Sequence, residues 1–319
     1  MSLTYKQSLY TRKVAIIGAG YVGSTIAYAL TLRELAHEIV LVDIDFDKAT
    51  GEAMDIQHGV ADIGDSFVRA GHYSDCSDCD LIIITAGRNR TPGESRLDMI
   101  YDNIQIMHNV VEQLQKYYTK GAIMVVSNPV DILTFECDRL MKLKNGRVFG
   151  TGCVLDSSRL TKAIADYTNL SSESVQCFVA GEHGETQFPL WSRMTIAGEP
   201  IADYCANTGL PWGSDQQSSL QKTVRDLGTR IIAAKGRTHY GIATCVCSLA
   251  TAILNHQSII ASVTTPLRGE YGIRGVALSL PSVVTADGVE RRLEERLTDD
   301  EIICLNRSAE CLKQAMRQF

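Results

Sequence analysis

A glycine-rich turn near the start of the 319-residue chain is the feature that most constrains its fold. The apolar run 14–17 leads into the sequence G-A-G-Y-V-G at positions 18–23, after which apolar residues recur at helical spacing. Glycines at these positions let a strand turn tightly into a helix, and the N–H groups at the helix N-terminus then attract a phosphate. Because glycine triplets also arise in ordinary turns, the interpretation depends on the residues beyond the motif.

An aspartate ends the next predicted strand at the spacing that a dinucleotide-binding site requires. The apolar run 39–42 ends in Asp43, which comes 20 residues after Gly23. A carboxylate at this place accepts hydrogen bonds from the adenine ribose and repels a 2′-phosphate, which favours NAD over NADP. The alternative is a solvated aspartate at the end of a strand, without a ligand.

Apolar runs alternate with helical patterns throughout the first 150 residues. Further strands are predicted at 67–70, 81–84 and 122–126. Helices are predicted at 48–60 and, as a long amphipathic helix, from about residue 97. This alternation predicts an α/β fold with a doubly wound parallel sheet, the Rossmann architecture, whose ligands bind at the carboxyl ends of the strands. These ends carry the glycine turn, Asp43, the segment 85–90 and Asn128.

The pattern changes near Gly150, so we predict two domains. Residues 1–150 form a Rossmann domain for NAD, and residues 151–319 form a mixed α+β domain for the substrate. The expected elements of the second domain are a helix opened by Thr151 and Gly152, a strand at 175–180, a loop-rich segment at 200–215, helices at 220–232 and 242–254, antiparallel strands within 258–281, and a final helix capped by Thr298.

Composition argues against several classes of partner. The net charge is −6 and the isoelectric point is near 5.7, so a nucleic acid partner is not favoured. The ten cysteines lack zinc-site spacing, which predicts free thiols in a reducing cytosol and no bound metal. The N-terminus lacks the apolar stretch of a signal peptide, and no run approaches the roughly 18 apolar residues of a membrane span, so we expect a cytoplasmic protein.

A basic loop follows the predicted strand at 81–84. It carries Arg88, Arg90 and Arg96 and is broken by the proline and glycine at 92–93. Three guanidinium groups after a buried strand suggest an anion site under a movable flap. The alternative is a solvated surface loop whose arginines bind nothing.

Three residues of the second domain complete a candidate catalytic set. His183 lies just past the strand predicted at 175–180, between two glycines that would let a ligand approach closely, and its imidazole can exchange a proton near neutral pH. Asp156 and Arg159 are three residues apart in a predicted helix and so share a face. Alone, each could be structural, the histidine in packing and the other two as a surface ion pair. Together with the basic loop, they suit proton-coupled reduction of an anionic carbonyl compound.

Motifs along nearly the whole chain resemble the L-lactate/malate dehydrogenase family, and its bacterial L-lactate branch above all. They are, in order, G-A-G-Y-V-G, T-A-G-R-N-R-T-P-G-E-S-R-L-D, V-S-N-P-V-D-I-L-T, G-T-G-C-V-L-D-S-S-R-L and G-E-H-G-E-T-Q-F-P-L-W-S. The resemblance implies an enzyme that transfers a hydride between NAD and a small 2-hydroxy acid or 2-oxo acid.

The resemblance also implies a role for each candidate catalytic residue. His183 would give a proton to the ketone, and Asp156 would hold the imidazole in the required tautomer. Arg159 would bind the substrate carboxylate through two hydrogen bonds. Arg96 would polarise the ketone oxygen when its loop closes. The other implied substrate contacts are Arg90, Asn128 and Thr238.

Most of the implied cofactor contacts lie in the first domain. They are Gly18, Gly20, Val22, Gly23, Asp43, Lys48, Tyr73, Thr85, Ala86, Gly87, Arg88, Val126, Asn128 and, against the nicotinamide, Ile242. The resemblance further implies a homo-oligomer, either a tetramer or a dimer.

The motifs disagree about the substrate. Glu182 and Thr238 resemble the lactate branch, whereas Arg90 is the malate-type residue at a position where lactate enzymes usually carry glutamine. Arg90 could pair with the second carboxylate of oxaloacetate, and burying it against the methyl group of pyruvate would be costly. We favour pyruvate because most of the chain resembles the lactate branch. The alternatives are a malate dehydrogenase, a dehydrogenase for a larger 2-hydroxy acid, and a catalytically silent nucleotide-binding protein.

Fructose 1,6-bisphosphate is predicted to have little effect on activity. The bacterial lactate dehydrogenases that it activates use an arginine two residues past the Arg159 position and a histidine seven residues before the His183 position. This chain has Thr161 and Gln176 there. In steady-state assays the half-saturation concentration of pyruvate should stay unchanged on adding the sugar bisphosphate, and a clear drop would contradict the prediction.

Overall fold

The structure is a computed structural model that describes residues 12–88, 96–294 and 296–318. Contacts within the chain divide it into two units. Unit 1 comprises Met1–Gly150, His239–Ile259 and Val283–Arg291, and unit 2 comprises Thr151–Thr238, Ile260–Ser282 and Arg292–Phe319.

The core of unit 1 is a parallel sheet. Its strands are β1 (Lys13–Ile17), β2 (Glu38–Val42), β3 (Phe67–Ala70), β4 (Leu81–Ile84), β5 (Ala122–Val125) and β6 (Val148–Gly150). They are hydrogen-bonded in the order β6-β5-β4-β1-β2-β3, with every pair parallel. The central strands β1, β4 and β5 are apolar and buried at nearly every position, as expected of strands covered on both faces. The predicted doubly wound sheet is therefore confirmed.

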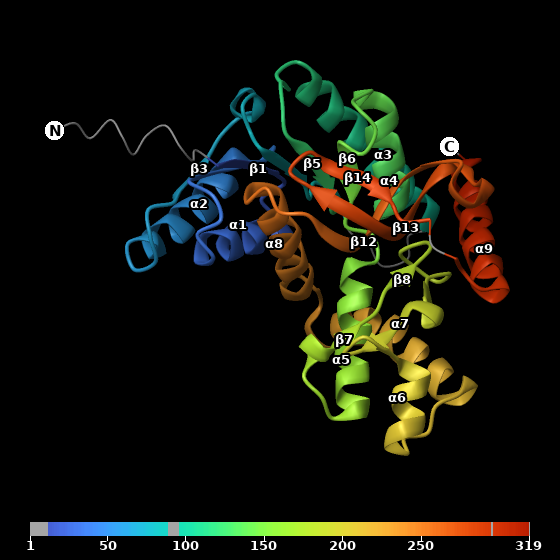
Figure 1. The fold of residues 1–319 in the computed structure, drawn as a ribbon. Coiled ribbons are helices and arrows are strands. Elements are labelled where there is room, and N and C mark those ends of the chain that lie inside the picture. Colours follow the sequence, from blue (N-terminus) through green and yellow to red (C-terminus); the bar gives the residue numbers. More distant parts are fainter. Residues whose placement is uncertain (1–11, 89–95, 295, 319) are drawn as a thin grey trace. The chain divides into compact units, whose positions relative to one another are not determined.

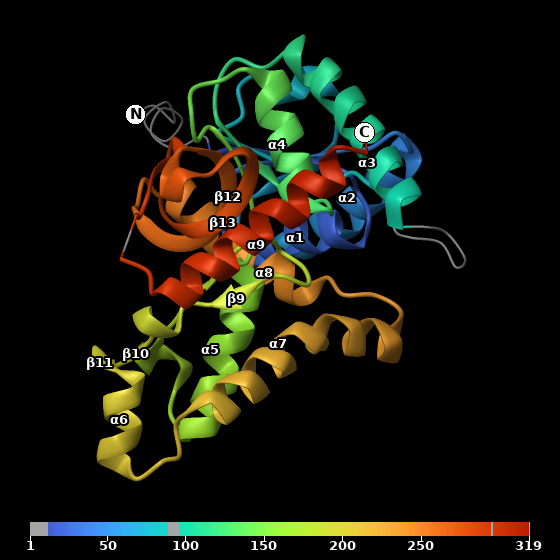
Figure 2. The same cartoon turned by 90° about the vertical axis from the view of Figure 1, so that its right-hand side faces the viewer.

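Helices cover both faces of this sheet (Figure 1 and Figure 2). They are α1 (Tyr21–Leu32), α2 (Phe46–Val60), α3 (Arg96–Gln115), α4 (Val130–Met141) and α8 (Tyr240–Leu254). Helix α1 packs against α2 and α8, whereas α3 packs against α4. The strand order reverses direction after β3, so right-handed crossovers place α1 and α2 on one face and α3 and α4 on the other. The reversal leaves the carboxyl ends of β1 and β4 side by side.

Unit 2 combines helices with short antiparallel strands, in agreement with the mixed α+β prediction. Its helices are α5 (Val154–Thr168), α6 (Ile201–Thr208), α7 (Ser214–Lys235) and α9 (Asp299–Met316). Its short strands are β7 (Val175–Gln176), β8 (Val179–Ala180), β9 (Phe188–Pro189), β10 (Thr195–Ile196) and β11 (Glu199–Pro200). Two long strands follow, β12 (Ile259–Arg268) and β13 (Arg274–Thr285); the end of β13 and most of the neighbouring strand β14 (Gly288–Arg292) belong to unit 1. A hydrophobic cluster around Leu160, Ile164 and Val179 joins α5 to the short strands.

Two predictions for this part of the chain were wrong. The segment 175–180 forms two strands rather than one, because β7 pairs with β10 whereas β8 pairs with β9. The segment 200–215 is not loop-rich, since it contains α6 and the start of α7. Pro200 is the N-cap of α6 and Gly209 ends it with a left-handed φ of 72°, so the two residues bound a short helix.

The final helix begins as predicted. Thr298 is the N-cap of α9, and its side chain and that of Glu301 accept from each other's backbone N–H groups in a capping box. Glu301 is buried and also accepts from the N–H and hydroxyl groups of Ser192, which fastens the start of α9 to the turn that follows β9.

Among the residues that the structure describes, no helix combines the length and the apolar character needed to cross a bilayer.

Candidate active site

The glycine turn between β1 and α1 has room only for glycine at two places. A Cβ added to Gly23 would lie 1.9 Å from the carbonyl oxygen of Gly18. Gly18 has a φ of +108°, and a Cβ there would lie 2.7 Å from the backbone nitrogen of Ala86. Helix α1 begins directly after Gly20, which caps it without a side chain. The turn thus leaves backbone N–H groups at the start of α1 for an anionic group, as a pyrophosphate requires.

Asp43 is attached to this turn. The residue is half-buried just past the end of β2, and its Oδ2 accepts from the backbone N–H of Ala19 at 2.6 Å. Its Oδ1 accepts from the N–H of Asp45 at 3.0 Å, close to the start of α2. Lys48 is exposed in the first turn of α2. The carboxylate therefore lies beside the glycine turn, where a ribose hydroxyl group could donate to it.

The loop after β4 is held to its neighbours by hydroxyl groups. The Oγ1 of Thr85 donates to the carbonyl oxygen of Gly18 at 2.8 Å. The Oγ of Ser127 donates to the carbonyl oxygen of Ala86 at 2.6 Å. These bonds bring together the carboxyl ends of β1, β4 and β5, as expected for a site at this edge of the sheet.

The other implied cofactor residues of unit 1 differ in exposure and in their partners. Arg88 pairs with Asp102 of α3, with a distance of 2.7 Å between guanidinium and carboxylate. Tyr73 lies in a short 3₁₀ helix, and burial raises its pKa to about 12, so its phenol stays protonated. Val126 is buried after β5, Ile242 is half-buried in α8, and Gly87 is exposed.

Two residues that sequence reasoning missed hold these loops together. They are Ser127, described above, and Asn103, whose carboxamide bonds to the backbone of both Arg88 and Asn128. A signal for Asn103 was present, because it interrupts the apolar face that Ile100, Ile104 and Met107 form along α3. A polar residue on a buried helical face needs a partner.

Unit 2 contains the predicted catalytic pair. The Oδ2 atom of Asp156 lies 2.6 Å from Nδ1 of His183, and its Oδ1 accepts from Nη1 of Arg159 at 3.1 Å. Asp156 is in the first turn of α5, so Arg159 follows on the same face, as predicted. The side chain of Asp156 is 2% exposed, whereas that of His183 is 26% exposed. The imidazole thus has a buried carboxylate on one side and an accessible edge on the other.

The loop that carries His183 is fixed by its backbone. Gly181 has a φ of +92° and exchanges two backbone hydrogen bonds with Ser279 of β13, each 3.0 Å long. Glu182 is buried and accepts from the hydroxyl group of Thr186 at 2.5 Å. Folding the chain in this way sets the direction of the His183 side chain.

The environment of Asp156 keeps it ionised. Burial alone would raise its pKa, but the neighbouring His183 and Arg159 outweigh burial and hold the pKa below its usual value. An ionised carboxylate next to Nδ1 favours the imidazole tautomer that keeps its proton on Nδ1. The other ring nitrogen, Nε2, is then the atom that can exchange a proton with a ligand.

Cys153 also lies near this pair. Its sulfur and the ligand atoms of Asp156 and His183 all lie within 4.8 Å of one another. Both oxygens of Asp156 already bond to His183 and Arg159, and Cys153 is buried, so a metal ion would have to break these bonds and bind a buried thiolate. The absence of a bound metal therefore stays our prediction.

Two of the predicted arginines are not fully described by the structure. Arg90 lies outside the described residues, and Arg96 begins α3 without a described side chain. Thr238 is half-buried at the end of a segment of unit 2. At the two positions tied to sugar bisphosphate, Thr161 donates to the carbonyl oxygen of Ser157, and Gln176 accepts from Thr195.

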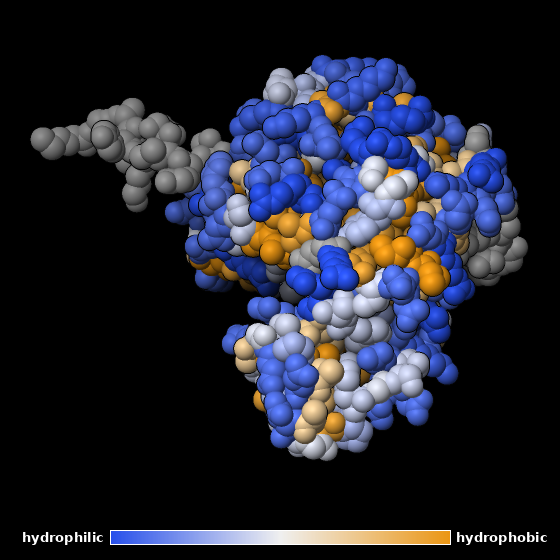
Figure 3. All heavy atoms as spheres, turned by 45° about the vertical axis from the view of Figure 1, so that its right-hand side comes forward, coloured by the Kyte–Doolittle hydropathy of each residue, from blue (hydrophilic) through white to orange (hydrophobic). Residues whose placement is uncertain are grey.

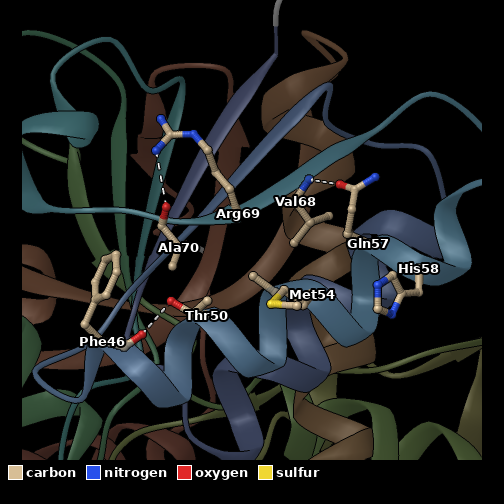
Figure 4. A pocket seen from close by; sticks show the side chains of 9 residues that line it. Phe46, Thr50, Met54, Gln57, His58, Val68, Arg69 and Ala70 are labelled. Atoms are coloured by element: carbon tan, nitrogen blue, oxygen red, sulfur yellow. Dashed lines mark hydrogen bonds between the residues drawn. The ribbon is translucent and has the colours of Figure 1, made fainter.

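A pocket of about 330 Å³ lies between α2 and β3 (Figure 4). None of the predicted site residues lines it. Two of its polar side chains bond within the wall: Gln57 accepts from the N–H of Val68 at 2.6 Å, and Thr50 donates to the carbonyl oxygen of Phe46 at 2.8 Å. The pocket therefore offers little polar recognition, and we assign it no ligand.

A doubly wound sheet with a glycine turn, followed by a unit with a carboxylate–imidazole pair, is the arrangement expected of a nucleotide-dependent dehydrogenase. Residues 12–150 match the family model described as lactate/malate dehydrogenase, NAD binding domain, and residues 153–319 match that of its alpha/beta C-terminal domain. The chain belongs to the lactate/malate dehydrogenase family. The expectations of a Rossmann fold and of NAD as cofactor are thereby confirmed.

Similar proteins carry lactate dehydrogenase names. The chain is 41% identical to an L-lactate dehydrogenase of Thermoanaerobacter pseudethanolicus, over 96% of this chain and 99% of that one. It is 40% identical to an L-lactate dehydrogenase of Priestia megaterium, over 95% of each chain. Among solved structures, the minor L-lactate dehydrogenase from Enterococcus mundtii superposes with a TM-score of 0.92 at 35% identity, over 97% of this chain and 98% of that one.

Replacing Asp156 by asparagine should remove a contribution to stability that depends on pH. Because the folded-state pKa of Asp156 is depressed, this contribution is fully present above the ordinary pKa of 3.8 and is lost as the pH falls through the lower folded pKa. In urea titrations, Asp156→Asn should have a lower free energy of unfolding than the parent at pH 7. The two values should approach each other below about pH 4.

The control for this experiment is Asp166→Asn, which changes an exposed carboxylate on the same helix. It should leave the free energy of unfolding close to that of the parent at both pH values. A difference between Asp156→Asn and the parent that stays constant with pH would contradict the assignment.

Proposed function

We propose that this protein is an NAD-dependent L-lactate dehydrogenase, which interconverts pyruvate and L-lactate. The observation that carries the proposal is the arrangement in unit 2, where buried Asp156 bonds to both His183 and Arg159. The names of the relatives at about 40% identity support the same activity. We assign NAD binding to residues 1–150 and substrate binding to residues 151–319, and the ranges of the two family models support this division.

His183 is the proposed acid and base. In pyruvate reduction its Nε2 gives a proton to the carbonyl oxygen, and in lactate oxidation it takes the proton back. Asp156 holds the proton on Nδ1 and stabilises the imidazolium that forms in the oxidation direction. NADH, when bound, supplies the hydride that the carbonyl carbon receives.

Arginines are the proposed anchors of the substrate. Arg159 presents a planar guanidinium that can bind a carboxylate through two hydrogen bonds, and its ion pair with Asp156 fixes it near His183. We assign Arg96 to polarising the carbonyl oxygen as negative charge develops on it. Asn128 would contact both substrate and cofactor, and Thr238 would contact the substrate.

The cofactor site follows from the geometry of unit 1. The N–H groups after Gly20 would receive the pyrophosphate beside Val22 and Gly23, and Asp43 would accept from the adenine ribose. The remaining proposed contacts are Lys48, Tyr73, Thr85, Ala86, Gly87, Arg88, Val126, Asn128 and Ile242. The turn fits a pyrophosphate because it is tight at Gly23, where a Cβ would lie 1.9 Å from the carbonyl oxygen of Gly18, and open at Gly20, where a Cβ would meet nothing within 4 Å.

Malate dehydrogenase is the second candidate function, and Arg90 is the observation that favours it. Its guanidinium could pair with the second carboxylate of oxaloacetate, which pyruvate lacks. We place lactate first because Glu182 and Thr238 are lactate-type and because the relatives named above are lactate dehydrogenases. A catalytically silent protein is disfavoured, since the Asp156–His183 hydrogen bond is formed and the His183 side chain is still 26% exposed.

Comparing pyruvate with oxaloacetate tests the proposal. We expect kcat/KM for pyruvate, followed by NADH oxidation, to exceed that for oxaloacetate, and Arg90→Gln to widen the gap because it removes the charge that favours a second carboxylate. His183→Asn should lower turnover about a hundredfold or more with either substrate. An oxaloacetate preference of about a hundredfold in the parent, worth roughly 2.7 kcal/mol of transition-state discrimination, would overturn the lactate assignment.

We also propose that the protein is a homo-oligomer, a tetramer or a dimer, and that it works in the cytoplasm. Several large apolar side chains of unit 1 are exposed, including Tyr21, Leu32, Ile44 and Met54. Figure 3 shows apolar side chains on the surface among mostly hydrophilic ones. Sedimentation velocity should give a mass of two or four times 35.0 kDa. A monomer at micromolar concentration would contradict the oligomer, and activity recovered only with membranes would contradict the location.

A further inference from the structure

One buried amide links the two loops of unit 1 that carry proposed substrate and cofactor contacts. Asn103 lies in the second turn of α3 and is 2% exposed. Its Oδ1 accepts from the N–H of Arg88 at 2.8 Å, and its Nδ2 donates to the carbonyl oxygens of Arg88 at 3.0 Å and of Asn128 at 2.9 Å. A single side chain thus holds three backbone groups, two in the loop after β4 and one in the loop after β5.

Only an amide of this length satisfies all three groups. An asparagine offers an acceptor and two donor hydrogens on a short side chain. An aspartate at position 103 could still accept from Arg88 but would place negative charge against two carbonyl oxygens. An apolar side chain would leave all three backbone groups without their partner, and unmade hydrogen bonds in a buried place are costly.

Hydrogen bonds hold Asn128 at both its backbone and its side chain. Its backbone carbonyl group is held by Asn103, and its side-chain Oδ1 accepts from the N–H of Val130 at 3.2 Å, at the start of α4. Ser127, the preceding residue, is tied to Ala86 at 2.6 Å. Asn128 itself is exposed and can meet a ligand while its backbone is held.

We propose that Asn103 is a positioning residue of the active site, which acts through Asn128. The inference rests on the proposed function, because it takes Asn128 as a contact for substrate and cofactor. Asn103 need not touch either of them. Its role is to hold the Asn128 peptide and the backbone of Arg88 in one arrangement, so that the Asn128 side chain keeps its direction.

The rival explanation is that Asn103 only attaches α3 to the sheet. Helix α3 already has a buried apolar face, with Ile100, Ile104 and Met107 on it. A purely structural amide would affect the stability of the fold and would change activity independently of Asn128. A positioning residue would lose its effect on activity once Asn128 is removed. A double-mutant cycle separates these explanations.

The cycle combines Asn103→Asp with Asn128→Ala. We expect Asn103→Asp alone to lower kcat/KM for pyruvate about tenfold or more, and to lower it less than about threefold in the Asn128→Ala background. The dissociation constant of NADH is measured for the same four proteins from NADH fluorescence. The effects of the two substitutions on this constant should also be less than additive. The matched control is Gln105→Glu, the same change from amide to acid at an exposed position of α3, which should alter neither quantity.

Each outcome is decisive. Losses that add in both measurements would overturn the positioning role. If the parent does not turn over pyruvate, the proposed function fails, and the NADH cycle still tests Asn103. Thermal unfolding identifies variants that do not fold. If Asn103→Asp is among them, Asn103→Ser replaces it, because its smaller polar side chain removes the bonds to Arg88 and Asn128 without adding a charge.

Discussion

The carboxylate of Asp156, buried between an imidazole and a guanidinium, makes the contacts on which the proposed catalytic arrangement depends. A buried carboxylate is costly unless its oxygens are paired, and here one oxygen bonds to His183 and the other to Arg159. Its position in the first turn of α5 adds the favourable field of the helix N-terminus. Removing either partner would leave charge unpaired in the interior, so stability and chemistry constrain the same three residues. The φ of Gly181 and its bonds to Ser279 serve this arrangement by bringing His183 to the carboxylate.

In unit 1, hydrogen bonds from short polar side chains hold the loops at the proposed ligand site. Its ligand site needs backbone groups at the ends of several strands, and loops do not hold such groups in place by themselves. Short polar side chains connect neighbouring loops instead: Asp43 to the glycine turn, Thr85 to Gly18, and Ser127 to Ala86. Each bond joins segments distant in sequence and lies at the carboxyl edge of the sheet. The buried apolar strands form a rigid sheet, and these hydrogen bonds hold the loops in fixed positions at its edge.

Most strands and helices of unit 1, and the residues proposed for catalysis in unit 2, could be predicted from the sequence. Strand β4 was predicted at its observed bounds, because a strand buried on both faces is a continuous apolar run. The contact between Asp156 and Arg159 followed from helical spacing alone. The division of 175–180 into two strands could not be predicted, since it depends on which remote strands pair with each half. Helix α6 was missed because proline and glycine usually indicate a loop, although at the two ends of a helix they bound it. The role of Asn103 was hidden because its partners are backbone atoms of two other segments.

The geometry of the catalytic residues cannot by itself decide between pyruvate and oxaloacetate. In the proposed mechanism both substrates offer the same carbonyl group to His183 and the same carboxylate to Arg159. These residues would therefore stabilise both transition states alike, and uniform stabilisation gives no discrimination. The difference must arise where the substrates differ, at the methyl group or the second carboxylate. A charged hydrogen bond made or left unmade at that place is worth about 1.5–3 kcal/mol, which corresponds to roughly ten- to a hundredfold in kcat/KM. One side chain can therefore set the preference, and the rest of the chain can belong to the lactate branch while Arg90 acts against it.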